Sequence, residues 1–145
     1  MKNIFSISLL LFTVLSLSAQ ERADLEIVVD GLRNSEGHLR LTLFDSDNGF
    51  PEDTDKAYTS KSIDLSKEKP VFRFENLKKG DYAYAILHDE DDNGKMKKNL
   101  IGIPKEGFGF SQNYRPKVGQ PEFKDASVYL SPGKNRHVIE IVYFL

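Results

Sequence analysis

The fold class is decided by the stretch LKKGDYAYAILH, which runs from Leu77 to His88. Its first half follows the pattern L-x-x-G-x-Y and ends at Tyr82. This pattern is typical of a tyrosine corner, in which a phenol hydroxyl bonds to backbone just upstream in a Greek-key sandwich. In the second half two sets of apolar side chains alternate, namely Tyr82, Tyr84 and Ile86 against Ala83, Ala85 and Leu87. A period of two indicates a β-strand, so the stretch predicts a strand of an antiparallel sandwich.

The same alternation recurs along the chain and predicts about seven strands. They are expected at residues 25–29, 39–43, 58–63, 71–74, 81–88, 126–130 and 136–144. Turn residues between the first two strands, from Asp30 to Gly37, predict that these two pair as an antiparallel hairpin. No segment after the N-terminus has a helical period. The sequence therefore predicts an all-β protein with a single antiparallel Greek-key sandwich, immunoglobulin-like or transthyretin-like.

The N-terminus, residues 1–19, has the pattern of a signal peptide. Lys2 is followed by the apolar segment Ile4–Leu17 and by the small pair Ser18–Ala19, ahead of a cut before Gln20. A membrane anchor is the alternative, but Ser and Thr interrupt this segment, and it is shorter than the roughly 18 apolar residues that a span needs. We expect an exported chain, periplasmic or extracellular, with a helical signal peptide, one domain at residues 20–145 and no membrane span after cleavage.

Composition limits the classes of partner. Without Lys2, 19 basic residues stand against 22 acidic ones, a formal charge of −3. The lysines are scattered among acids and form no sustained basic face, which excludes nucleic acid as an expected partner. The chain has no cysteine, so an exported domain of this size would rely on its apolar core rather than on disulfides.

The interval 89–125 lacks any period. A loop of this length in a compact domain is usually functional or disordered. Disorder is not expected here, because the interval contains many bulky apolar residues that favour packing. We therefore expect one long ordered loop over residues 89–125.

Four segments together resemble the bacterial exported family DUF2141. They are GHLRLTLFD at 37–45, LKKGDYA at 77–83, HDEDDNGK at 88–95 and GIPKEGFGFS at 102–111. The resemblance covers essentially all of residues 20–145, and it implies an exported β-sandwich without an assigned activity. The family's acidic loop typically carries a further aspartate where this chain has Lys97, so a cation here replaces one ligand of that loop.

The acidic loop itself resembles the opening of a calcium loop. Oxygen-bearing side chains at Asp89, Asp91 and Asn93 alternate along the chain and are followed by Gly94, which permits a sharp turn. The backbone carbonyl of Lys95 is the next candidate ligand. The glutamate that completes an EF-hand is absent, so Asn99 or water would have to supply further oxygens for Ca²⁺. The alternative is a plain turn whose acids face water.

Three further residues are candidate auxiliary ligands. Asp45 and Asp47 lie in a second acidic turn. If residues 58–63 form a strand in simple up-and-down order, this turn and the loop after His88 lie at opposite ends of the sandwich; otherwise the two meet. His88 could ligate a softer metal or gate an ion site, or it could bond to nearby loop backbone.

A candidate binding surface follows the acidic loop. Phe108, Phe110 and Tyr114 would form an aromatic platform for a sugar or peptide, with Glu106 beside them. The alternative is that these aromatics form a satellite of the core. Glu106 with Asp89 or Asp91 is also the one carboxylate pair that suggests glycoside hydrolysis.

The function expected from the sequence is a non-enzymatic exported sandwich that binds a ligand or is stabilised by a cation. Its partner would be an envelope protein or a carbohydrate of unknown identity. A purely structural assembly module of the cell envelope is the first alternative. A small carboxylate-dependent hydrolase is the second, although no nucleophile motif such as G-x-S-x-G is present.

Overall fold

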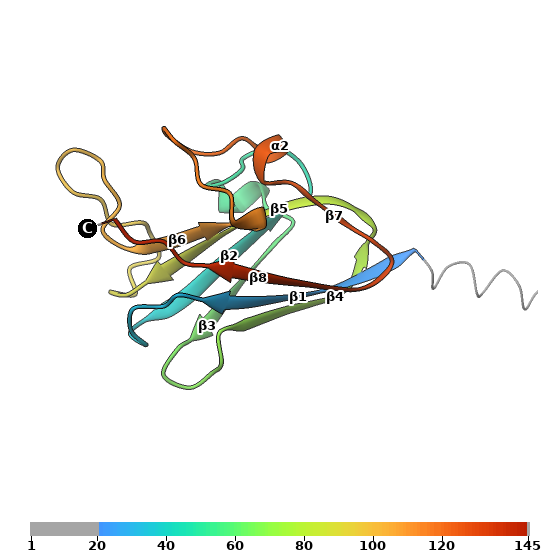
Figure 1. The fold of residues 1–145 in the computed structure, drawn as a ribbon, viewed down its shortest axis with the longest axis horizontal. Helices are drawn as coiled ribbons and strands as arrows, with labels where there is room; N and C mark the ends of the chain where they lie inside the picture. Colours follow the sequence, from blue (N-terminus) through green and yellow to red (C-terminus); the bar gives the residue numbers. More distant parts are fainter. Residues whose placement is uncertain (1–20, 145) are drawn as a thin grey trace, which may run out of the picture.

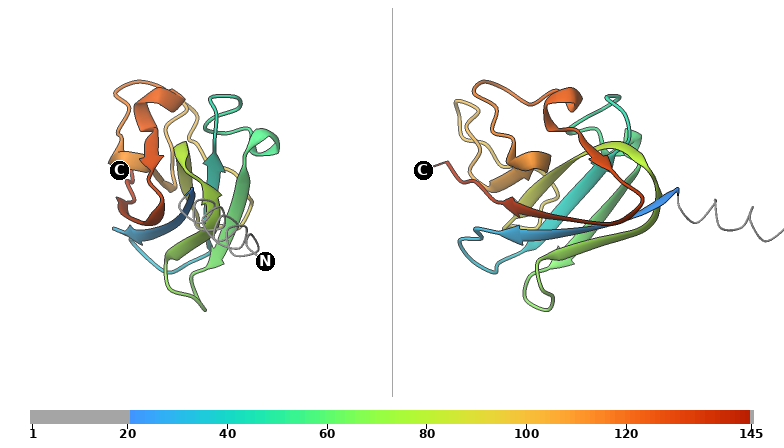
Figure 2. Two further views of the ribbon diagram at one scale, coloured as in Figure 1. Left: turned by 90° about the vertical axis from the view of Figure 1, so that its right-hand side faces the viewer. Right: turned by 45° about the vertical axis from the view of Figure 1, so that its right-hand side comes forward.

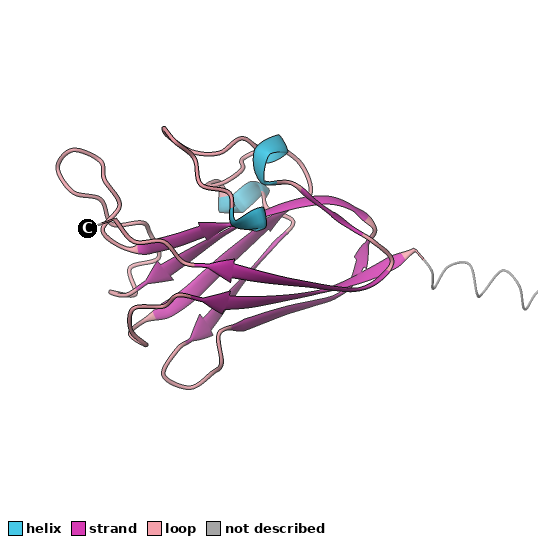
Figure 3. Cartoon of the chain, in the orientation of Figure 1, coloured by secondary structure: helices cyan, strands magenta, loops and turns pink. Residues whose placement is uncertain are grey.

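A computed structural model describes residues 21–144, which form a two-sheet sandwich (Figures 1 and 3). The expected signal peptide, residues 1–19, lies outside the described residues. Within residues 21–144 the chain forms eight strands and three short helical turns. No helix in this range has the length and apolarity that crossing a membrane requires.

The smaller sheet has three strands in the order β4-β1-β8. Its central strand β1 (Arg22–Asp30) pairs antiparallel with β4 (Val71–Lys78) and parallel with β8 (Gly133–Glu140). The predicted hairpin of the first two strands is therefore wrong, because β2 lies in the other sheet. The purely antiparallel prediction is also wrong at β8. A period of two identifies the buried face of a strand but not the strand beside it.

The larger sheet has the order β3-β2-β5-β6, with β7 paired to the start of β5. Its strands are β2 (His38–Phe44), β3 (Thr59–Asp64), β5 (Gly80–Asp89), β6 (Gly107–Phe110) and β7 (Val128–Leu130). All pairings in this sheet are antiparallel. β2 therefore runs opposite to both β3 and β5, so the ends of β2 and β5 lie at opposite ends of this sheet.

The core lies between the sheets and is made of the alternating residues that the sequence predicts. In β1, Ala23, Leu25, Ile27 and Val29 are at most 3% exposed. They join one cluster with the inward residues of the larger sheet, which include Leu39, Leu41, Leu43, Tyr84 and Ile86. Burial of each large aliphatic side chain contributes about 1.5–3 kcal/mol. The residues of this core all lie within 21–144, so a chain from Gln20 onward contains them.

The interval 89–125 is not one unstructured loop. It contains β6, the 3-10 turn η2 (Ser111–Asn113) and most of the short helix α2 (Phe123–Ala126), which takes Ala126 out of the predicted strand 126–130. β6 has the sequence GFGF, whose glycines allow the chain after β8 to pack closely. A Cβ at Gly107 would lie 2.4 Å from the Tyr143 ring. β8 ends at Glu140 rather than at 144, and Val142, two residues further on, bridges to Phe108.

The tyrosine corner is confirmed. The Tyr82 hydroxyl donates to the Lys78 carbonyl oxygen at 3.0 Å, and the Tyr82 side chain is 4% exposed. The bond closes the tight turn between β4 and β5, which are the edge strand of one sheet and a central strand of the other. It fixes the point at which the chain crosses between the sheets.

Removal of this hydroxyl should weaken the fold. We expect Tyr82→Phe to lower the free energy of unfolding by about 1 kcal/mol, the usual net contribution of one hydrogen bond. The matched control is Tyr129→Phe, because Tyr129 is 57% exposed. Urea unfolding measures both variants. Equal stability of the two would show that the corner bond does not contribute.

Candidate functional site

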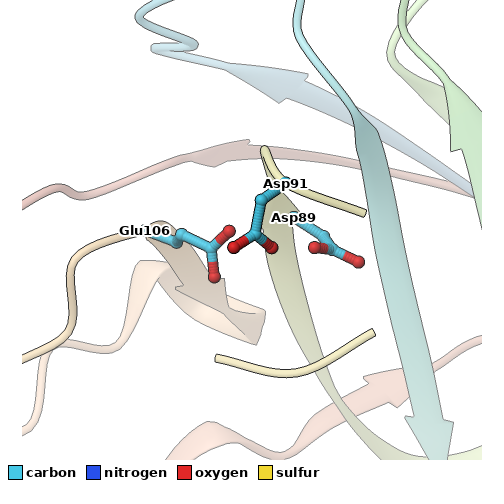
Figure 4. Close-up of side chains that lie close together, drawn as sticks. All are labelled: Asp89, Asp91 and Glu106. Atoms are coloured by element: carbon cyan, nitrogen blue, oxygen red, sulfur yellow. The ribbon is translucent and has the colours of Figure 1, made fainter. Parts of the chain in front are cut away.

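Three carboxylates converge where β5 ends and β6 begins. Asp89 is the last residue of β5, Asp91 lies in the turn after it, and Glu106 directly precedes β6 (Figure 4). Oxygens of the three, one from each, lie within 4.8 Å of one another. The register explains the convergence, because His88 pairs with Gly107 and the residues just beyond this pair become neighbours. We call these three residues the acidic cluster.

Asp89 is completely buried and folds the turn around its carboxylate. Its Oδ1 accepts the backbone N–H of Asn93 at 3.0 Å, and its Oδ2 accepts the N–H of Gly94 at 2.8 Å. The Nε of Arg40, from β2, also donates to Oδ2. This hydrogen bond is the main cause of the raised pKa of Arg40. A buried carboxylate is stable in a fold only with such partners.

Glu106 is 3% exposed and joins the two sides of the β5–β6 connection. Its Oε1 accepts the N–H of Glu90 at 3.0 Å, and its Oε2 accepts the N–H of Lys97 at 2.9 Å. The carboxylate of Glu106 lies with those of Asp89 and Asp91 rather than beside an aromatic platform.

Lys97 places a positive charge directly on the cluster. Its ammonium lies 3.0 Å from Oδ2 of Asp91, and both side chains are partly exposed. The hydrogen bond from Lys97 lowers the pKa of Asp91. The pKa of Lys97 is raised, mainly by this bond with Asp91 and further by the charge of Glu106. The ammonium is thus already paired with one carboxylate of the acidic cluster.

The cluster borders an open hollow of about 530 Å³ at this end of the sandwich. Its lining residues are all polar or charged: Arg33, Asn34, Glu36, Glu90, Asp91, Lys97, Lys105 and Glu106. The connection between β1 and β2 supplies Arg33, whose Nε donates to Oε1 of Glu90 at 2.9 Å. This pairing lowers the pKa of Glu90. Four carboxylates and three basic side chains give the hollow a nearly balanced charge.

The side-chain oxygens of the other predicted calcium ligands, Asn93 and Asn99, accept backbone N–H groups close by in the sequence. Oδ1 of Asn93 accepts the N–H of Lys95 at 2.8 Å, and Oδ1 of Asn99 accepts the N–H groups of Ile101 and Ile103 at 3.0 and 2.9 Å. Both amide oxygens therefore cap their own turns. Lys95 lies in the exposed turn after Gly94.

The auxiliary ligands are contradicted by the strand register. Phe44 pairs with Ala83, whereas His38 pairs with Asp89, so Asp45 and Asp47 lie at the far end of the sheet, about 20 Å away. His88 is completely buried and both ring nitrogens are engaged. Nδ1 lies 2.6 Å from the Tyr143 hydroxyl and Nε2 lies 2.9 Å from the Glu36 carbonyl oxygen. His88 therefore bonds to nearby loop backbone, which was the alternative interpretation of this residue.

The aromatic platform is contradicted as well. Phe110 is 9% exposed, and Phe108 and Tyr114 are half-buried against the same small cluster. The Phe50 ring packs edge-on to both Phe110 and Phe123. These aromatics are the satellite core that the sequence left as the alternative.

Comparison with known proteins gives a family but no activity. A family model described as "Uncharacterized protein conserved in bacteria (DUF2141)" matches residues 27–138. A search of curated proteins found no match. The solved structures that match include a pilus-presented adhesin, at 13% identity and a TM-score of 0.29. That match covers 83% of this chain and 26% of the adhesin chain.

The buried carboxylate should be essential to this end of the fold. We expect Asp89→Asn to lower the free energy of unfolding by about 2–4 kcal/mol, because it breaks a buried charged pair and sets an amide donor against N–H donors. The control is Asp92→Asn, which removes the exposed second partner of Arg40 and should change stability by less than about 1 kcal/mol. Urea unfolding compares them. Equal losses would contradict the role given to Asp89.

Proposed function

The chain belongs to the DUF2141 family of bacterial proteins, and on this premise we propose that it is an exported, non-enzymatic sandwich domain whose acidic cluster binds a divalent cation. Calcium is the first candidate. The observation that carries the proposal is the convergence of Asp89, Asp91 and Glu106, with one oxygen from each within 4.8 Å of the others. Carboxylate oxygens are the preferred ligands of hard cations.

The donor set fits calcium in part. Ca²⁺ takes about six to eight oxygens, and carboxylate oxygens that accept one N–H bond retain a second lone pair for a metal. Bidentate carboxylates and water would supply the rest. The Lys97 ammonium has to move away from Asp91 when the metal binds. Its position allows this, because the side chain is 55% exposed and flexible. Cation affinity is therefore set by competition between the metal and this ammonium.

The same contacts speak against the hydrolase alternative. Glycoside hydrolysis needs one carboxyl group held protonated beside an ionised one. The pKa of Asp91 is lowered rather than raised. Asp89 and Glu106 have both oxygens on donors of the chain itself. This arrangement suits the binding of positive charge better than proton donation.

The remaining parts of the proposal concern export, topology and partner. Export rests on the signal-peptide pattern of residues 1–19. The tyrosine corner supports the finer description as an immunoglobulin-like or transthyretin-like Greek key. The charged hollow beside the cluster is the surface on which an envelope protein or a carbohydrate would bind.

One observation favours a second candidate, a purely structural envelope module. Asp89 is paired with Arg40, and Asp91 is paired with Lys97. Two of the three carboxylates are thus paired with basic side chains of the chain itself, and Lys97 acts as a built-in cation. In this case the end of the sandwich is rigid scaffolding that needs no metal.

Thermal unfolding of the chain Gln20–Leu145, in EDTA and then in calcium, separates these candidates. A calcium concentration of about ten times Kd stabilises the folded state by about 1.4 kcal/mol and raises Tm by roughly 5 °C. We expect this rise in the wild type and a larger one in Lys97→Ala, which removes the competing ammonium. Asp91→Asn with Glu106→Gln should abolish it.

The matched control is Asp45→Asn with Asp47→Asn at the opposite end of the sheet, which should keep the wild-type response. A calcium-dependent rise in Tm that is seen in Lys97→Ala but not in the wild type would favour the structural module with its built-in cation. No rise in either the wild type or Lys97→Ala would overturn the cation proposal.

A further inference from the structure

An exposed apolar tip projects from the connection between β5 and β6. Leu100 is fully exposed, Ile101 is 79% exposed and Ile103 is 40% exposed. Figures 1 and 2 show this connection as a loop that extends beyond the two sheets. Three exposed aliphatic side chains in succession are unusual, because apolar surface of this kind is normally buried or marks an interaction site. We call residues 98–105 the finger.

Hydrogen bonds within the finger hold this tip in shape. The Asn99 N–H donates to the Ile103 carbonyl at 2.9 Å, and the Asn99 side chain accepts the N–H groups of Ile101 and Ile103. The Gly102 N–H donates to the Asn99 carbonyl at 3.0 Å, and Lys98 bridges to Pro104. Asn99, which the sequence predicted as a calcium ligand, is therefore the residue whose hydrogen bonds build the tip. The exposure of the aliphatic side chains is part of the fold.

The same bonds prepare the tip for an environment with little water. Four backbone N–H groups of the finger, those of residues 99 and 101–103, are bonded within it, and Pro104 has none. The N–H of Lys105 donates to the Lys97 carbonyl at 2.8 Å. Transfer of backbone out of water is unfavourable when its polar groups lose their partners. Most donors of this tip retain theirs.

The lysines around the tip indicate which kind of partner it binds. The segment 95–105, KMKKNLIGIPK, has four lysines and no acidic residue. Lys98 and Lys105 lie at the two sides of the base of the finger. Aliphatic side chains at a tip, with flexible ammonium groups behind them, match the layering of acyl chains and phosphates in a lipid surface. An apolar protein groove would not require the lysines.

We propose that the finger inserts Leu100 and Ile101 into the surface of an anionic phospholipid bilayer while Lys98 and Lys105 contact the lipid phosphates. The domain then attaches peripherally, through one loop at the end of the sandwich. This site is separate from the acidic cluster, and it does not depend on a bound cation.

Vesicle sedimentation tests the proposal with the chain Gln20–Leu145. We expect binding to vesicles of phosphatidylglycerol and phosphatidylcholine in equal parts, weaker binding at high salt, and little binding to phosphatidylcholine alone. Leu100→Ser with Ile101→Ser should weaken binding by at least about tenfold. The control is Tyr129→Ser with Val138→Ser, two exposed residues of β7 and β8, which should leave binding unchanged.

Tryptophan fluorescence gives a second readout, because the chain has no tryptophan. In Leu100→Trp the emission should shift to shorter wavelength with the anionic vesicles only. Tyr129→Trp should show no shift. Absence of binding by the wild type, or equal binding by the finger variant, would overturn the proposal. Self-association that is lost in the finger variant, without vesicle binding, would also overturn it and assign the tip to a protein surface.

Discussion

Two buried carboxylates, Asp89 and Glu106, determine the shape of one whole end of the sandwich. A carboxylate buried away from water needs hydrogen-bond donors around it. Here most of the donors are backbone N–H groups of the β5–β6 connection. The 15 residues between Glu90 and Glu106 are thus folded onto these two side chains. The turn after β5, the start of β6 and the base of the finger all follow from this one requirement.

Lys97 connects the two surfaces of this end. Its backbone N–H bonds to Glu106, its carbonyl accepts from Lys105, and its ammonium contacts Asp91. Lys97 therefore lies between the acidic cluster and the base of the finger and contacts both.

Local patterns were sufficient for much of the fold. The alternation in β1, β2 and β5 and the spacing that ends at Tyr82 depend on neighbouring residues, and these features are present as predicted. β6 was missed because GFGF has no polar alternation and half of its residues are glycine. The partners of β1 were missed because they depend on which strands the rest of the chain supplies. The alternation of apolar residues along a strand does not show which distant strand will pair with it.

The same division applies to the candidate site. Asp89 and Asp91 were found from their local spacing, but Glu106 joins them only through the pairing of β5 with β6. The local sequence could not distinguish two roles for Asn93 and Asn99, because an amide that caps its own turn, as both do here, has the same neighbours as one that binds a metal. Asp45 and Asp47 could be placed only once the order of β3, β2 and β5 was known.

The parallel pairing of β1 with β8 has a consequence for how the domain forms. The first strand of the sheet lies beside the last, and the ion pair between Glu26 and Arg136 joins residues 110 positions apart. Such distant contacts slow folding, because a long loop must close before they form. Until β8 arrives, one side of the central strand β1 has no partner. The smaller sheet is therefore completed only when nearly all of residues 21–144 are free to fold.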